Sequence, residues 1–128
     1  MKKTPWKDFE EKARICLQRR FKCSLSNEKV FINGKGKKLD LVNKKLKIAG
    51  DVKNYCNTKG GNSPEAKRSI LNEYVWILQK LPKRWKKLIV LGEDISMAKN
   101  YIRDYDPWLN GVTFYFYHRK SGLKLLKK

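Results

Sequence analysis

The unbroken apolar run Leu88–Leu91 constrains the fold more than any other segment of the chain. Four consecutive apolar residues leave neither face of a strand polar, which is typical of a strand covered on both faces. Such a strand needs a helical layer on each side of its sheet. The run therefore predicts an α/β fold in which this strand is covered on both faces.

Helices and strands alternate around this run. Helical periodicity predicts helices that begin at Thr4-Pro5, at Ser63-Pro64 and after Asp94, where the leading residue suits an N-cap. Short β-like runs predict the strands Lys29–Asn33, Lys38–Val42, Leu46–Tyr55, Leu88–Leu91 and Val112–Tyr117. The order is α-β-β-β-α-β-α-β, with a tight hairpin at Asn43–Lys45 and a strand-helix-strand unit long enough for a parallel crossover. We therefore expect a mixed sheet flanked by helices.

The inward faces of the later helices follow from the same periodicity. The second helix is expected to bury a stripe formed by Ala66, Ile70, Tyr74, Ile77, Leu78 and Leu81. The third is expected to turn inward Ile95, Ala98 and Ile102. The last residues, Ser121–Lys128, form a short basic tail without a clear pattern.

The chain of 128 residues is expected to form one domain, since no linker, repeat or low-complexity segment divides it. A domain of this length buries roughly two-thirds of its unfolded surface, so it needs no disulfide or structural metal. Cys16, Cys23 and Cys56 lack paired spacing, and with a single histidine they exclude a zinc site. Free thiols and the lack of an apolar leader after Met1 predict a cytoplasmic location.

The formal net charge is +19, from 31 Lys and Arg against 12 Asp and Glu. Self-repulsion of this size destabilises a compact state unless a polyanionic partner selects for it. No lipidation motif, basic amphipathic helix or long apolar run favours a membrane, so we expect DNA or another nucleic acid as the partner. The candidates for phosphate contacts are Lys35, Lys37, Lys38, Lys59, Lys83, Arg84, Lys86 and Lys87.

Asp51 and Lys53 point to the same side of their predicted strand, because side chains alternate along a strand. The hairpin places Asp40 opposite Ile48 or Ala49, so that Asp51 is its diagonal neighbour within about 7–8 Å. Two carboxylates at this range bind one divalent cation, and an adjacent ammonium orients water. The simpler alternatives are an ion pair between Asp51 and Lys53 and a turn-forming role for Asp40.

Glu10 is a carboxylate on an apolar stripe. It shares one face of the first helix with Trp6, Ala13 and Leu17, whereas Glu11 lies on the polar face. A carboxylate on a burying face costs free energy unless it is paired or metal-bound. Glu10 is therefore a candidate metal ligand, and the alternative is an interaction with the helix dipole.

The pattern of Glu10, Leu39-Asp40-Leu41-Val42 and Gly50-Asp51-Val52-Lys53 resembles the PD-(D/E)xK nuclease superfamily. The resemblance implies a restriction-endonuclease-like α-β-β-β-α-β core over about residues 5–92. Residues 93–118 would add an α-β extension and 119–128 a basic tail. It also implies that Asp40 and Asp51 bind the metal, that Lys53 positions water, and that Glu10 is an auxiliary ligand.

Size and the first-helix glutamate are most similar to the Holliday-junction resolvase branch. Two positions depart from the usual pattern: Asp51 stands where resolvases usually have Glu, and Leu39 where the name-giving motif often has Pro. The resemblance implies a DNA endonuclease that uses Mg²⁺ or Mn²⁺. Cutting two strands with one site per chain would favour a homodimer.

Three alternatives remain open at this point. They are a site-specific restriction-type endonuclease, a non-catalytic nucleic-acid-binding module on the same fold, and an RNA-binding protein of the ribosome-associated kind. A module without catalysis would tolerate loss of the Asp40, Asp51 and Lys53 set, which is intact. An RNA-binding protein would account for the charge but not for the inward-facing Glu10.

Overall fold

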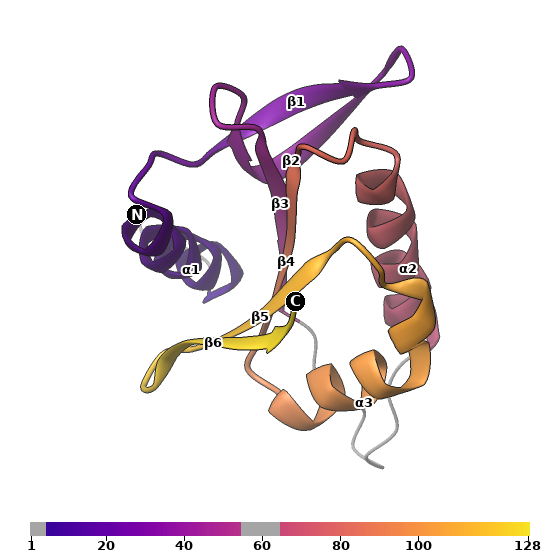
Figure 1. Cartoon of the computed structure of the whole chain (residues 1–128). Helices are drawn as coiled ribbons and strands as arrows, with labels where there is room; N and C mark the ends of the chain where they lie inside the picture. Colours follow the sequence, from indigo (N-terminus) through magenta and orange to yellow (C-terminus); the bar gives the residue numbers. More distant parts are fainter. Residues whose placement is uncertain (1–4, 55–64) are drawn as a thin grey trace.

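The computed structural model describes residues 5–54 and 65–128 (Figure 1). Its elements in chain order are α1 (Pro5–Phe21), β1 (Ser26–Ile32), β2 (Lys35–Asn43), β3 (Ile48–Lys53), α2 (Glu65–Gln79), β4 (Lys86–Gly92), α3 (Ile95–Tyr105), the 3₁₀ turn η1 (Asp106–Trp108), β5 (Thr113–His118) and β6 (Gly122–Lys127). Within the described residues, no helix has the length and apolar character needed to cross a bilayer. The predicted caps Thr4 and Ser63 lie outside these residues.

The six strands form one mixed sheet in the order β1-β2-β3-β4-β5-β6. The pairs β1–β2, β2–β3 and β5–β6 are antiparallel, whereas β3–β4 and β4–β5 are parallel. Figure 1 shows α1 on one face of the sheet and α2 and α3 on the other. The α/β class and the mixed sheet with helices on both faces are therefore confirmed.

The expected basic tail is part of the sheet. Its residues form β6, which extends the sheet beyond β5. Leu123 packs against the cluster on the α1 face, and Leu126 packs against the cluster on the opposite face. These two contacts on opposite faces explain how the segment is held as an edge strand of the sheet.

β4 is buried on both faces, as its apolar run predicts. Leu88 and Val90 belong to the cluster under α1, and Ile89 and Leu91 belong to the cluster under α2 and α3. None of the four side chains is more than 2% exposed. Full burial of such a side chain contributes roughly 1.5–3 kcal/mol, so β4 is the common core strand of both layers.

The packing of Phe9 fixes the start of α1 over the sheet. Phe9 is completely buried and meets the ring of Tyr117 edge-on at 5.4 Å between centroids. A Cβ added to Gly92, at the end of β4, would lie only 1.8 Å from the Phe9 ring. The ring therefore needs glycine at this position. Because Glu10 follows Phe9, the same contact sets where Glu10 meets the sheet.

The predicted stripe of α2 is confirmed at its C-terminal end and wrong at its N-terminal end. Leu78 and Leu81 are buried as predicted, and Tyr74 and Ile77 pack partly buried against the same core cluster. Leu71 and Val75 are also buried, whereas Ala66 and Ile70 are exposed. Both of these pairs satisfy helical spacing, so only packing against the sheet selects between them. The observed rotation leaves Trp76 on the outside of the helix with 59% of its surface exposed.

α3 begins as the sequence predicts. The Asp94 side chain accepts a hydrogen bond at 3.0 Å from the Met97 backbone N–H, which caps the helix. Ala98 is buried as expected, but Ile95 is 37% exposed and Met97 takes the inward position. The sequence therefore predicted the first residue of α3 correctly from its capping residue. It predicted the inward-facing residues of the helix only in part.

Candidate active site

A β-bulge in β2 sets the position of Asp40. The β1–β2 register shifts by one residue between Ser26 and Glu28, so that Asp40 and Leu41 together lie opposite Asn27. The Asn27 side-chain amide donates a hydrogen bond of 3.1 Å to Oδ1 of Asp40. A bulge interrupts the regular alternation of side chains and redirects the residue that it contains. The Asp40 side chain therefore does not follow the regular alternation of side chains along β2.

Asp40 and Asp51 lie just beyond the paired part of the β2–β3 hairpin. The last pair joins Leu41 to Gly50, and Asp40 and Asp51 are the next residues on the two strands. The sequence predicted a diagonal arrangement because it placed the turn at Asn43–Lys45. The turn instead occupies residues 44–47, which changes the register from the predicted one.

At this point of the hairpin, the side-chain carboxylates of the two aspartates accept hydrogen bonds from main-chain N–H groups, in place of main-chain carbonyl groups. Oδ1 of Asp51 accepts a hydrogen bond of 3.1 Å from the Asp40 backbone N–H. Oδ2 of Asp40 accepts one of 3.1 Å from the Val52 backbone N–H. Each aspartate is therefore held by the main chain of the opposite strand, which restricts both side chains to one arrangement.

Asp51 and Lys53 form a buried ion pair. Oδ2 of Asp51 lies 2.7 Å from Nζ of Lys53, and the two side chains are only 3% and 14% exposed. The same ammonium lies 3.9 Å from the centroid of the Tyr74 ring on α2. Within the described residues, Oδ2 of Asp51 accepts no hydrogen bond of regular geometry besides this ionic contact. A buried oxygen with this spare capacity suits a cation ligand.

Glu10 reaches the aspartates from α1. Its side chain is 13% exposed and lies 4.0 Å from Nη1 of Arg14. Burial raises the pKa of Glu10, and repulsion and a hydrogen bond shared with the Asp40 carboxyl add to this, while Arg14 and Lys53 oppose it. Glu10 thus interacts with Asp40 and Lys53, and these two residues also interact with Asp51. The four residues that the sequence singled out separately therefore form one connected group at the β2–β3 hairpin.

The pKa of Asp51 reflects the burial of its carboxyl group and the proximity of Asp40. Burial, followed by hydrogen bonding to and repulsion from Asp40, raises the pKa of Asp51 from 3.8 to about 7, although Lys53 opposes the shift. A divalent cation would relieve the same repulsion, and carboxylate oxygens are the ligands that hard cations prefer. The donor set therefore fits Mg²⁺ or Mn²⁺.

Asp40 and Asp51 are close neighbours, since each carboxylate is bonded to the main chain of the other strand. Among the residues that the structure describes, no three acidic, cysteine or histidine side chains are spaced as a ready metal-binding group. The positive charge in contact with Asp51 is the Lys53 ammonium. Binding a cation would require the carboxylates of Glu10, Asp40 and Asp51 to close around it.

The raised pKa of Asp51 predicts how metal-free stability depends on pH. The folded state holds this proton more tightly than the unfolded chain does, so its stabilising effect is present below pH 3.8 and is lost as the pH rises to about 7. Asp51→Asn has no carboxyl group to ionise at this position, so the variant does not lose stability in this way as the pH rises. The stability of the variant relative to the wild type is expected to grow by about 2–4 kcal/mol between pH 4 and pH 8.

Urea unfolding in EDTA at the two pH values measures this difference. A constant difference between Asp51→Asn and the wild type would contradict the raised pKa.

Two of the predicted phosphate-binding lysines lie beside the candidate site. Lys35 and Lys37 extend from β2 toward α2, and Nζ of Lys37 lies 4.7 Å from the centroid of the Tyr74 ring. The Lys53 ammonium contacts this same ring. Lys38 is exposed on the neighbouring position of β2. Lys37 therefore adds a second ammonium group at the Tyr74 ring, beside that of Lys53.

Another predicted group lies at the opposite end of the sheet. Lys83, Arg84 and Lys86 are exposed at the start of β4. The β3–β4 register aligns Lys86 with Ile48 and places Lys53 five residues further along the strand, roughly 16 Å away. DNA would have to extend along the sheet to contact both groups.

Lys87 and Lys59 complete the predicted set. Lys87 is only 8% exposed, and its ammonium donates a buried hydrogen bond of 2.8 Å to the Leu81 carbonyl. Its position on β4 turns it inward, so the expected phosphate contact of Lys87 does not fit the structure. Lys59 lies outside the described residues.

Sequence reasoning missed three residues around the site. Asn27 holds Asp40, Tyr74 lies under Lys53, and Trp76 is exposed on α2 nearby. The available signal for Trp76 was that its neighbours one helical turn away are polar, namely Asn72, Glu73, Gln79 and Lys80. Asn27 and Tyr74 act through contacts with distant parts of the chain, which leave no local pattern.

Comparisons with known proteins do not supply a family. No protein-family model matches the chain, and no curated protein or solved structure matches it significantly. Function is therefore inferred from the residues and their geometry.

Proposed function

We propose that this protein is a DNA endonuclease that depends on Mg²⁺ or Mn²⁺ and has a restriction-endonuclease-like core. The observation that carries the proposal is a connected group of three carboxylates and one ammonium from α1, β2 and β3, in which Asp40 and Lys53 link Glu10 to Asp51. The order α1-β1-β2-β3-α2-β4 supports it, because this is the element order of that superfamily's core.

Each residue has a role in phosphodiester hydrolysis. Asp40 and Asp51 would hold the cation, with Glu10 as a further ligand from α1. When bound, the cation polarises the phosphoryl group and lowers the pKa of its bound water. The Lys53 ammonium, which Asp51 and the Tyr74 ring hold in place, would orient the attacking water and stabilise the charge that develops on the phosphate.

The net charge of +19 supports DNA as the substrate. The proposal includes a homodimer, in which two copies of the site could cut two strands. It also includes a reducing cytoplasmic location, with which the free thiols of Cys16 and Cys23 agree.

Cleavage of supercoiled plasmid and of a synthetic four-way junction tests the proposal. With Mg²⁺ or Mn²⁺ we expect hydrolysis of at least one of these substrates, and with Ca²⁺ we expect binding without turnover. Preference for the junction would favour a resolvase-like enzyme, and cutting of the plasmid at one site would favour a restriction-type enzyme. Undiminished cleavage in excess EDTA would exclude the metal mechanism. Tight binding without cleavage under all metals would favour the non-catalytic module.

A further inference from the structure

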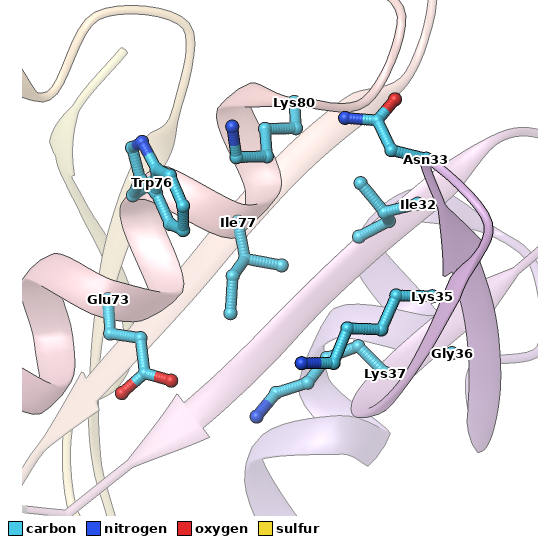
Figure 2. A pocket seen from close by; sticks show the side chains of 9 residues that line it. All are labelled: Ile32, Asn33, Lys35, Gly36, Lys37, Glu73, Trp76, Ile77 and Lys80. Carbon is cyan, nitrogen blue, oxygen red and sulfur yellow. The ribbon is translucent and has the colours of Figure 1, made fainter.

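A groove of about 390 Å³ lies between the β1–β2 hairpin and α2 (Figure 2). Figure 2 shows Lys35 and Lys37 reaching into it from the hairpin, with Ile77 on the helix facing them. Trp76 and Lys80 lie along its helical wall. This volume is near the lower end of the range for small-ligand sites, about 300–1,000 Å³, so it suits one nucleotide rather than a double helix.

The charge of the groove suits a phosphate-bearing ligand. Three lysines, Lys35, Lys37 and Lys80, line it, whereas Glu73 is the acidic residue in the same described lining. The excess of positive charge and the net charge of +19 both favour an anionic occupant. The apolar side chain of Ile77 lies between the lysines of the two walls.

Trp76 offers a stacking surface inside this basic groove. Its indole is 59% exposed, and Nζ of Lys80 lies 3.9 Å from the ring centroid. Aromatic rings beside basic side chains are the usual means by which proteins bind unpaired bases, because every base has a π-face. A base that stacks on Trp76 would displace Lys80 from the ring and leave its ammonium free to meet a phosphate.

The groove adjoins the candidate active site through Tyr74. Lys37, which lines the groove, and Lys53, which pairs with Asp51, both place their ammonium groups over the Tyr74 ring, at 4.7 and 3.9 Å. A DNA strand that passes from the groove to the carboxylates would therefore meet these two ammonium groups in succession.

We propose that this groove binds an unpaired nucleotide of the DNA strand whose neighbouring phosphate enters the candidate site. The base stacks on Trp76, and Lys35, Lys37 and Lys80 contact the phosphates. A base in a duplex has both faces covered by its neighbours, so this site selects DNA with a single-stranded segment next to the point of cleavage. The inference rests on the proposed DNA substrate, but binding in the groove requires neither metal nor hydrolysis.

Binding of labelled oligonucleotides in EDTA tests the groove. A single strand and a blunt duplex of the same length are titrated against the wild type, Trp76→Ala, Trp76→Phe and Trp108→Ala. Trp108 is the matched control, since it is 71% exposed on η1 and does not line the groove. Trp76→Ala is expected to weaken single-strand binding roughly 5- to 100-fold and to change duplex binding less than twofold.

The other variants separate stacking from general damage. Trp76→Phe keeps a ring and is expected to recover most of the lost affinity, while Trp108→Ala is expected to bind like the wild type. Equal losses in Trp76→Ala and Trp108→Ala, or equal losses for single strand and duplex, would overturn the proposal. Tighter Trp76-dependent binding of single-stranded RNA of the same sequence would overturn the assignment to DNA. Because the assay contains no metal, an inactive enzyme with Trp76-dependent binding would contradict only the proposed hydrolysis.

Discussion

Asp51→Asn is expected to lower the rate of DNA cleavage roughly a thousandfold, because it removes a charge that acts on the reacting phosphate through the metal. Asp40→Asn and Lys53→Ala should have effects of similar size. DNA binding should stay close to that of the wild type or tighten, since the aspartate variants remove negative charge that faces the DNA. Cleavage rates at saturating enzyme and binding in Ca²⁺ measure the two effects separately. A wild-type rate for Asp51→Asn would remove the nuclease assignment.

Glu10→Gln and Glu11→Gln form the sharper comparison. The two glutamates are adjacent on α1, and consecutive helix positions differ by about 100° in direction. The Glu10 side chain is 13% exposed, and burial followed by repulsion from Asp40 raises its pKa. Glu10→Gln is expected to slow cleavage tenfold or more and Glu11→Gln less than twofold. Equal effects would show that Glu10 is not part of the site.

The affinity for DNA is expected to fall about 10³- to 10⁵-fold between 50 and 200 mM salt, if six to ten phosphates are contacted. The net charge of +19 provides more than enough cations for this number. Lys35→Gln combined with Lys37→Gln should reduce the slope of log affinity against log salt by about 2. Anisotropy titrations across this salt range measure both quantities.

Lys87→Met provides the control for these charge variants. The Lys87 ammonium is bonded to the Leu81 carbonyl inside the protein, so its loss should leave the salt slope unchanged. The variant should lose some stability, because the carbonyl loses its partner. A flat salt titration of the wild type would show that the basic surface serves another kind of partner.

The sequence by itself determined those features of the protein that depend only on residues close together in the chain. Leu88–Leu91 is buried on both faces as predicted, because four apolar residues in a row leave a strand no polar face. Asp94 caps α3 because its carboxylate can reach the Met97 N–H three residues away in any helix that starts there. The prominence of Asp40, Asp51 and Lys53 also came from local pattern, since charged residues interrupt otherwise apolar strands.

Only the tertiary structure decided how these residues meet. A single extra residue in β2 places Asp40 in a bulge, and a longer turn changes the β2–β3 register from the predicted one, although neither change has a local signature. Packing against the sheet buries Leu71 and Val75 of α2 and leaves Ala66 and Ile70 exposed, which helical spacing alone did not decide. In the packed helix Tyr74 lies under Lys53 and Trp76 lies in the groove. Register and rotation depend on packing between segments distant in sequence, whereas capping and strand burial depend on residues within reach of one another along the chain.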